Sequence, residues 1–109
     1  MRNTQAWRGV IDMSIHRYAT RQDGNHRAIV NALRAGGARV YEIRVPCDLL
    51  VGYAGKTALV ECKDLSTGYG RKGLNDNQRS FAQTWNGGTF ATITDIEGAG
   101  RLLKLMGEA

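Results

Sequence analysis

The sequence predicts a single α/β domain, in which a central mixed sheet with an antiparallel hairpin is flanked by helices. The length of 109 residues suits one domain. Two apolar runs on either side of Ala54-Gly55 have the composition of a β-hairpin. Segments with helical spacing of apolar residues come before and after strand-like segments. Together these observations predict the order α-β-β-β-α-β-α.

The first element is a helix over residues 24–35, and its apolar side chains share one stripe: Ile29, Val30 and Leu33. Asp23 or Asn25 can cap its start, and Gly36-Gly37 ends it. A strand is expected over residues 38–45, before Pro46.

The hairpin is expected to pair residues 48–53 with 57–63 through a two-residue turn. In that register Asp48 lies opposite Glu61, and Lys63 shares their face because side chains alternate along a strand. The opposite face is apolar and reads as core: Cys47, Leu49, Val51, Tyr53, Ala58, Val60 and Cys62. Cys47 and Cys62 are therefore expected to be neighbouring reduced thiols.

The second half begins with a mobile, glycine-rich basic loop over residues 64–74. A helix over 76–86 follows, with Asn75 as its cap and Gln78 at the capping-box position. Its apolar side chains are expected in the core: Leu74, Phe81 and Trp85. A strand over 89–94 and a last helix complete the domain, and Thr94 with Glu97 forms a second candidate capping box.

The net charge of +5 is concentrated in the first part of the chain. Residues 1–44 contain eight arginines and three acidic residues, whereas residues 45–109 are balanced. This asymmetry indicates either a polyanionic partner or a solubilising surface. No segment approaches the ~18 apolar residues of a membrane span, and the start lacks a signal-peptide core, so a cytoplasmic protein with no membrane partner is expected.

The three polar residues of the hairpin point to phosphate chemistry. Asp48 and Glu61 repel each other when they lie opposite, and a divalent cation would offset that repulsion. Lys63 beside such a cation can position a water or stabilise developing phosphate charge. The alternative is a salt-bridge triad on the solvent face of the hairpin. The histidines, His16 and His26, are expected to face solvent or phosphate.

The spacing of Asp48, then Glu61-Cys62-Lys63, resembles the D…(D/E)-x-K signature of the PD-(D/E)XK nuclease superfamily. "DLLVGYAGKTALVECKD", a basic glycine-rich loop and "LNDNQRSFAQTW" resemble the VRR-NUC and archaeal-type Holliday junction resolvase branch, which includes many small phage proteins. The resemblance implies a restriction-endonuclease-like core over residues 23–109. Residues 1–22 form an unassigned extension.

The resemblance also implies roles for individual residues. Asp48, Glu61 and the backbone carbonyl of Cys62 would hold Mg²⁺ or Mn²⁺, and Lys63 would orient the attacking water. Gln78 corresponds to a glutamine that reaches the active site in this branch, although its capping-box role explains it equally. The residues expected to contact DNA are Arg21, Arg27, Arg71 and Lys72. Tyr69 belongs to the same segment as the last two.

The sequence also departs from the family pattern. Relatives often carry a glutamate on the first helix, and the matching position here is Ala28. Asp23 or Asn25 could substitute for it from the helix start, with helix capping as the alternative role. The implied activity is hydrolysis of phosphodiester bonds in branched or junction DNA, leaving 5′-phosphate and 3′-hydroxyl ends. A homodimer in the cytoplasm of a bacterial or phage-infected cell is expected. The alternative is a weak or inactive DNA-binding module that retains the nuclease fold.

Overall fold

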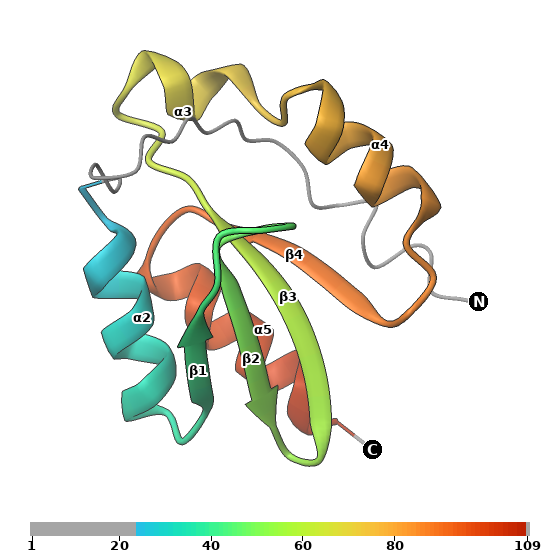
Figure 1. Ribbon diagram of the computed structural model, residues 1–109. Coiled ribbons are helices and arrows are strands. Elements are labelled where there is room, and N and C mark those ends of the chain that lie inside the picture. The colour runs from blue at the N-terminus through green and yellow to red at the C-terminus, as the bar shows by residue number, and fades with distance from the viewer. Residues whose placement is uncertain (1–23, 109) are drawn as a thin grey trace.

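The computed structural model describes residues 24–108, which form an α/β domain with a four-stranded mixed sheet flanked by helices (Figure 1). The extension over residues 1–22, Arg21 and Asp23 lie outside the described residues. The elements in chain order are α2 (His26–Ala35), β1 (Arg39–Glu42), β2 (Leu49–Tyr53), β3 (Lys56–Cys62), α3 (Gly68–Lys72), α4 (Asp76–Thr84), β4 (Thr89–Ile93) and α5 (Ile96–Gly107). In the part of the chain from residue 24 to 108, no helix is long and apolar enough to cross a bilayer.

The strands lie in the order β1-β2-β3-β4, with β3 at the centre beside both β2 and β4. β1 pairs with β2 and β2 with β3 in antiparallel fashion, whereas β3 and β4 are parallel. Leu50 pairs with Leu59 and Gly52 with Thr57, which confirms the predicted hairpin register. The turn residues Ala54 and Gly55 both have positive φ (55° and 79°), as a two-residue hairpin turn of the primed type requires.

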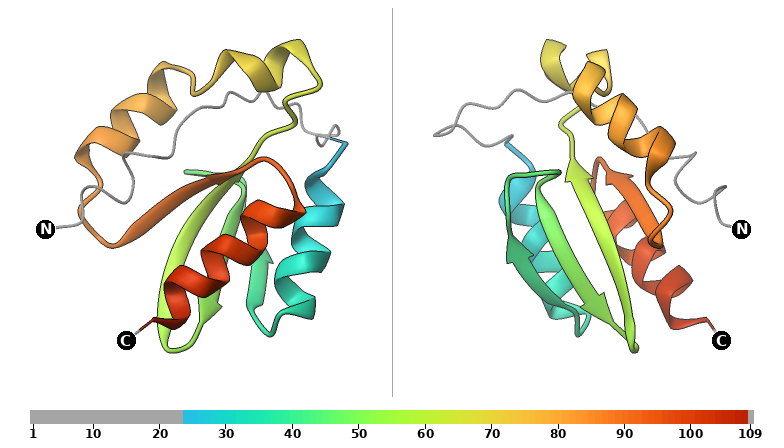
Figure 2. Two further views of the ribbon diagram at one scale, coloured as in Figure 1. Left: turned by 180° about the vertical axis from the view of Figure 1, so that it is seen from behind. Right: turned by 45° about the vertical axis from the view of Figure 1, so that its right-hand side comes forward.

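One face of the sheet is covered by α2 and α5, which lie side by side behind the strands (Figure 2). The main core forms between them, because each helix turns its apolar stripe to the sheet. Its buried members include Ile29, Val30 and Leu33 of α2, Leu102 and Met106 of α5, and Leu49, Val51, Val60, Cys62 and Ile93 of the strands.

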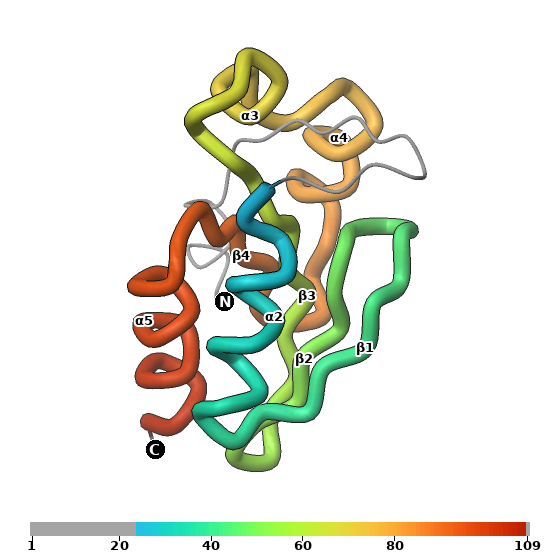
Figure 3. Tube along the Cα trace, turned by 90° about the vertical axis from the view of Figure 1, so that its left-hand side faces the viewer, coloured from blue at the N-terminus to red at the C-terminus, as the bar shows by residue number. Residues whose placement is uncertain are grey.

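The other face carries a smaller core beneath α4, which lies with α3 across one end of the strands (Figure 3). The core residues on this face are Cys47, Leu59, Leu74, Ala82 and Phe90, with Leu50, Phe81 and Trp85 partly buried against them. Phe81 stacks on Trp85 and meets Phe90 edge-on, so the aromatic residues of this helix face pack in the core as predicted.

The segment over residues 64–74 is not simply a loop, because it contains the helix α3. The Thr67 hydroxyl oxygen accepts a hydrogen bond from the Gly70 amide (2.8 Å) and caps this helix. A Cβ on Gly70 would lie 1.7 Å from the carbonyl oxygen of Asp64, so the backbone can approach this closely only at a glycine. The glycines therefore permit a compact turn here instead of marking an unstructured segment.

The start of α5 also differs from the prediction. Asp95, and not Thr94, occupies the cap position, and its carboxylate accepts a hydrogen bond from the Gly98 amide (2.7 Å). Aspartate caps helices at least as well as threonine does. The helix therefore begins one residue later than predicted, with Asp95 as its cap in place of Thr94. Asn75 and Gln78, in contrast, form the predicted capping box of α4.

Candidate active site

Glu61 and Lys63 lie at the end of β3, on the face of the sheet that α4 covers. The Glu61 side chain points to the same face of the sheet as that of Leu59, which belongs to the core beneath α4. The Lys63 amide donates to the Ile93 carbonyl of β4 (3.0 Å), so the strand-like alternation continues to Lys63. Glu61 is 1 % exposed and Lys63 0 % exposed. The alternative of a salt bridge on a solvent face is therefore wrong, because neither side chain faces solvent.

Asp48 is held at the same end of the sheet by backbone contacts on both sides. Its carbonyl accepts a hydrogen bond from the Ile43 amide (2.8 Å), which closes the connection from β1 to β2. Its Oδ2 atom accepts a hydrogen bond from the Cys62 amide (2.8 Å), so the carboxylate is anchored to the residue between Glu61 and Lys63. The structure thus brings Asp48, Glu61, Cys62 and Lys63 together where β2 begins and β3 ends.

Cys47 does not lie where the sequence analysis placed it. It belongs to the core beneath α4, whereas Cys62 lies in the main core on the opposite face, so the two free thiols are not neighbours. The reason is that β2 begins only at Leu49. The Arg44 amide donates to the Cys47 carbonyl (3.1 Å), and Arg44 has a φ of 107°, so the preceding residues form a turn in which strand alternation does not apply.

Burial, together with the negative charges of Glu61 and Asp48, raises the pKa of the Cys47 thiol to about 12. Both carboxylates therefore lie close enough to one sulfur atom to influence it, as expected for two acidic side chains gathered at one end of the sheet.

The raised pKa predicts how stability depends on pH in the presence of EDTA. A thiol with a folded pKa above its unfolded value keeps its proton longer in the folded state. Its stabilising contribution is present below pH 9.0 and is lost as the pH rises toward about 12. Across that window the free energy of unfolding of the wild type should fall by about 1.4 kcal/mol per pH unit more than that of Cys47→Ala. Urea denaturation of both proteins checks this, and equal slopes would contradict it.

Gln78 forms the capping box and also contacts Glu61. Its Oε1 atom accepts a hydrogen bond from the Asn75 amide (3.1 Å), while its own amide donates to Asn75 Oδ1 (2.8 Å). Its Nε2 atom donates to Glu61 Oε2 (3.2 Å). The capping box therefore fixes the side chain in the orientation that presents an N–H group to the buried carboxylate.

Because Gln78 makes both contacts, the Gln78→Glu variant should keep the helix cap while losing the hydrogen bond to Glu61. Glutamate keeps an oxygen for the Asn75 amide but loses the N–H donor and adds a negative charge beside Glu61. We expect stability within about 0.5 kcal/mol of the wild type, and a reduction of about tenfold or more in the phosphodiester cleavage that the nuclease resemblance implies. Gln78→Ala, which removes both contacts, should also lose about 1 kcal/mol of stability. Full cleavage by Gln78→Glu would show that the Glu61 contact has no role in the site.

The start of α2 lies beside the same strand ends, and Asn25 joins them. Its side chain makes no capping hydrogen bond, contrary to the expectation that it caps the helix. Instead Nδ2 donates to the carbonyls of Lys63 (3.0 Å) and Thr94 (2.7 Å), which fixes the orientation of the amide because both partners are acceptors. Oδ1 is buried and has no hydrogen-bond partner among residues 24–108. A buried acceptor of this kind suits a donor such as water.

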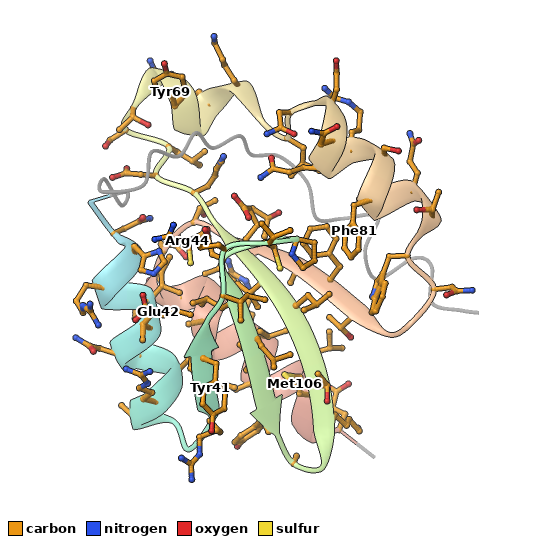
Figure 4. The ribbon with its side chains drawn as sticks, viewed as in Figure 1. Tyr41, Glu42, Arg44, Tyr69, Phe81 and Met106 are labelled. Carbon is orange, nitrogen blue, oxygen red and sulfur yellow. The ribbon has the colours of Figure 1, made fainter. Side chains whose placement is uncertain are left out.

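His26 is buried (6 % exposed), contrary to the expectation that it faces solvent. Its Nε2 atom lies 3.2 Å from Oε1 of Glu42, which stands between β1 and α2 (Figure 4). The sequence contained a signal for this position, because His26 precedes Ile29, Val30 and Leu33 at helical spacing and so falls on the apolar stripe.

The candidate DNA contacts that the structure describes surround this end of the domain. Arg27 follows His26 in α2 and lies 3.7 Å from Glu42 Oε2, although its side chain is largely exposed. In α3, Arg71 donates to the Leu65 carbonyl (3.1 Å), and the Lys72 ammonium lies 5.7 Å from the centre of the Tyr69 ring. Tyr69 is 56 % exposed at the outer end of the molecule (Figure 4).

Comparisons of the chain with protein-family models, curated proteins and solved structures find no match.

Proposed function

We propose that this chain is a divalent-metal-dependent endonuclease that hydrolyses phosphodiester bonds in DNA with a restriction-endonuclease-like core. The observation that carries the proposal is the burial of Glu61 and Lys63 on one face at the end of β3, with Asp48 anchored beside them. Buried charges are costly and concentrate at sites where they do chemistry. A purely structural sheet would place apolar residues at these positions.

The donor set fits a hard cation. Asp48 and Glu61 supply carboxylate oxygens, and the Cys62 carbonyl belongs to the backbone that joins Glu61 to Lys63. Carboxylates that gather in this way repel each other until a cation lies between them. Asn25 Oδ1 adds a buried acceptor without a protein partner among the described residues, which supports its auxiliary role. Mg²⁺ or Mn²⁺ bound here would polarise the scissile phosphate and lower the pKa of a nearby water.

The residues around the ion would bind it, orient the attacking water and stabilise the developing charge. Asp48 and Glu61 would hold the ion, and Gln78 keeps Glu61 oriented through its Nε2–H group. The Lys63 ammonium orients the attacking water and stabilises the charge that develops on the phosphate. The surrounding burial strengthens each of these interactions, because the local dielectric is lower than that of water.

DNA as the substrate is supported by the charge distribution, since a polyanion is attracted to the arginine-rich first part of the chain. Exposed Arg27 and Lys72 lie on elements that border the site. Branched or junction DNA and a homodimer form part of the proposal, because a twofold dimer presents two sites to symmetric strands.

The test is a cleavage assay with Mn²⁺ or Mg²⁺ on linear, nicked, flapped and four-way DNA. We expect cleavage of at least one branched substrate, its loss in EDTA and its recovery when the metal is restored. An Asp48→Asn variant that folds as the wild type does should be inactive on every substrate. Equal cleavage by wild type and Asp48→Asn would overturn the assignment of the site.

A second outcome would identify the alternative function, a non-catalytic DNA-binding module, which Ala28 motivates. That outcome is absence of cleavage and of metal-binding heat, together with DNA binding that weakens steeply as salt rises. Isothermal titration with Mn²⁺ separates the two, because the nuclease proposal requires binding heat that Glu61→Gln removes.

A further inference from the structure

A second cluster of potential metal ligands lies on the other side of β3 from Glu61. The His26 ring, the Asp48 carboxylate and the Cys62 thiol offer one ligand atom each, and these atoms all lie within 4.8 Å of one another. His26 and Cys62 are buried, whereas Asp48 is partly exposed. The cluster joins the start of α2, the residue before β2 and the end of β3, so it is assembled by the fold and not by neighbours in sequence.

The chemistry of this cluster differs from that of the Asp48–Glu61 site. A thiolate and an imidazole are ligands for Zn²⁺ and similar transition metals, whereas Mg²⁺ prefers oxygen. Glu42 Oε1 contacts Nε2 of His26, which leaves Nδ1 as the ring nitrogen without that contact. A carboxylate that holds the far nitrogen of a ligating histidine is a common feature of zinc sites, where it orients the ring and raises its basicity.

We propose that His26, Asp48 and Cys62 bind Zn²⁺ or a chemically similar transition-metal ion, with Glu42 orienting His26. Three protein ligands leave one coordination position open to water. Cys62 releases its proton to the solvent when its sulfur binds the metal. The ion enters past Asp48, the one partly exposed ligand.

Asp48 is common to both sites, and this gives the second site a regulatory consequence. When Asp48 binds a Zn²⁺ ion beside Cys62, it is withdrawn from the cation that it would share with Glu61. Zn²⁺ therefore inhibits cleavage in competition with Mg²⁺. This consequence rests on the proposed nuclease function, whereas binding of the transition metal does not.

The binding test uses Co²⁺, which has similar ligand preferences and gives a near-ultraviolet charge-transfer absorption when a thiolate coordinates it. Titration of the full chain without Mg²⁺ should produce this absorption at one equivalent. Cys47→Ser should retain it, since Cys47 lies on the opposite face, and Cys62→Ser should lose it. Glu42→Gln should weaken Co²⁺ binding about tenfold. If Cys62→Ser does not fold by circular dichroism, His26→Gln serves instead and should weaken binding by more than about tenfold.

Absence of the absorption in the wild type, its persistence in Cys62→Ser, or Co²⁺ binding by His26→Gln as tight as that of the wild type would overturn the proposed site. The competition is tested separately by adding Zn²⁺ to the cleavage assay at several Mg²⁺ concentrations. Inhibition should weaken by at least about tenfold in Glu42→Gln, in line with its weaker metal binding. A wild type that binds Co²⁺ but never cleaves DNA would leave this metal site intact and reject the nuclease proposal alone.

Discussion

Replacing Glu61 with glutamine is expected to abolish metal-dependent cleavage without destabilising the fold. Glutamine keeps the shape of the side chain but removes the negative charge that would hold the cation. We expect cleavage to fall by at least about 10³-fold, because the cation that Glu61 would hold is lost together with the charge stabilisation that it would give the transition state. In EDTA the free energy of unfolding should be unchanged or higher by up to about 1 kcal/mol, since a repulsive neighbour of Asp48 has been removed.

Single-turnover cleavage and urea denaturation in EDTA measure these two effects on the same preparations. Glu108→Gln, at an exposed position after α5, is the matched control and should behave as the wild type does. If Glu61 only neutralised Lys63, its loss would leave a buried positive charge and cost about 3 kcal/mol of stability. Such a loss in Glu61→Gln would favour a structural pair over a metal site.

The Lys63→Met substitution is expected to affect both activity and stability, and the second effect should depend on the metal. Methionine fills a similar space but removes the buried positive charge at the end of β3, where Glu61 is buried as well. In EDTA we expect a loss of about 3 kcal/mol, typical of removing one partner of a buried charge cluster. Mg²⁺ should restore part of it, because a bound cation stabilises the folded state. Cleavage should stay at least about 10²-fold below the wild type even with saturating Mg²⁺.

Thermal or urea denaturation with and without Mg²⁺ checks the stability of this variant, and single-turnover cleavage checks its activity. Lys104→Met provides the control, since Lys104 is exposed on α5. A Lys63→Met protein that cleaves DNA normally would show that Lys63 supports the fold and takes no part in the chemistry.

The hairpin could be read from the sequence because several independent signals agree there. Alternation of side chains, the Ala54-Gly55 turn and an apolar opposite face all require the register that pairs Leu50 with Leu59. That register sets the facing of Glu61 and Lys63. Their burial could not be read from the hairpin, because it depends on α4 and on Gln78, which are distant in sequence.

The errors lie where alternation or helical spacing ends. Strand alternation places Cys47 on the same face as Cys62, but β2 begins two residues after Cys47, which lies in a turn. The sequence allows Asp23 or Asn25 to cap α2, but the Asn25 amide reaches the carbonyls of Lys63 and Thr94, which only the tertiary fold brings near. The loop containing Gly70 has a composition typical of a mobile segment, and a close backbone contact with Asp64 orders it into α3 instead.

A crystal of the full chain grown with Mn²⁺ tests the central claim most directly, because the anomalous signal of manganese locates the ion independently of any activity. We expect one carboxylate oxygen from Asp48 and one from Glu61 to contact the same ion, and the peak to disappear in Glu61→Gln crystals grown in the same way. An empty space between these two carboxylates at saturating Mn²⁺ would contradict the account.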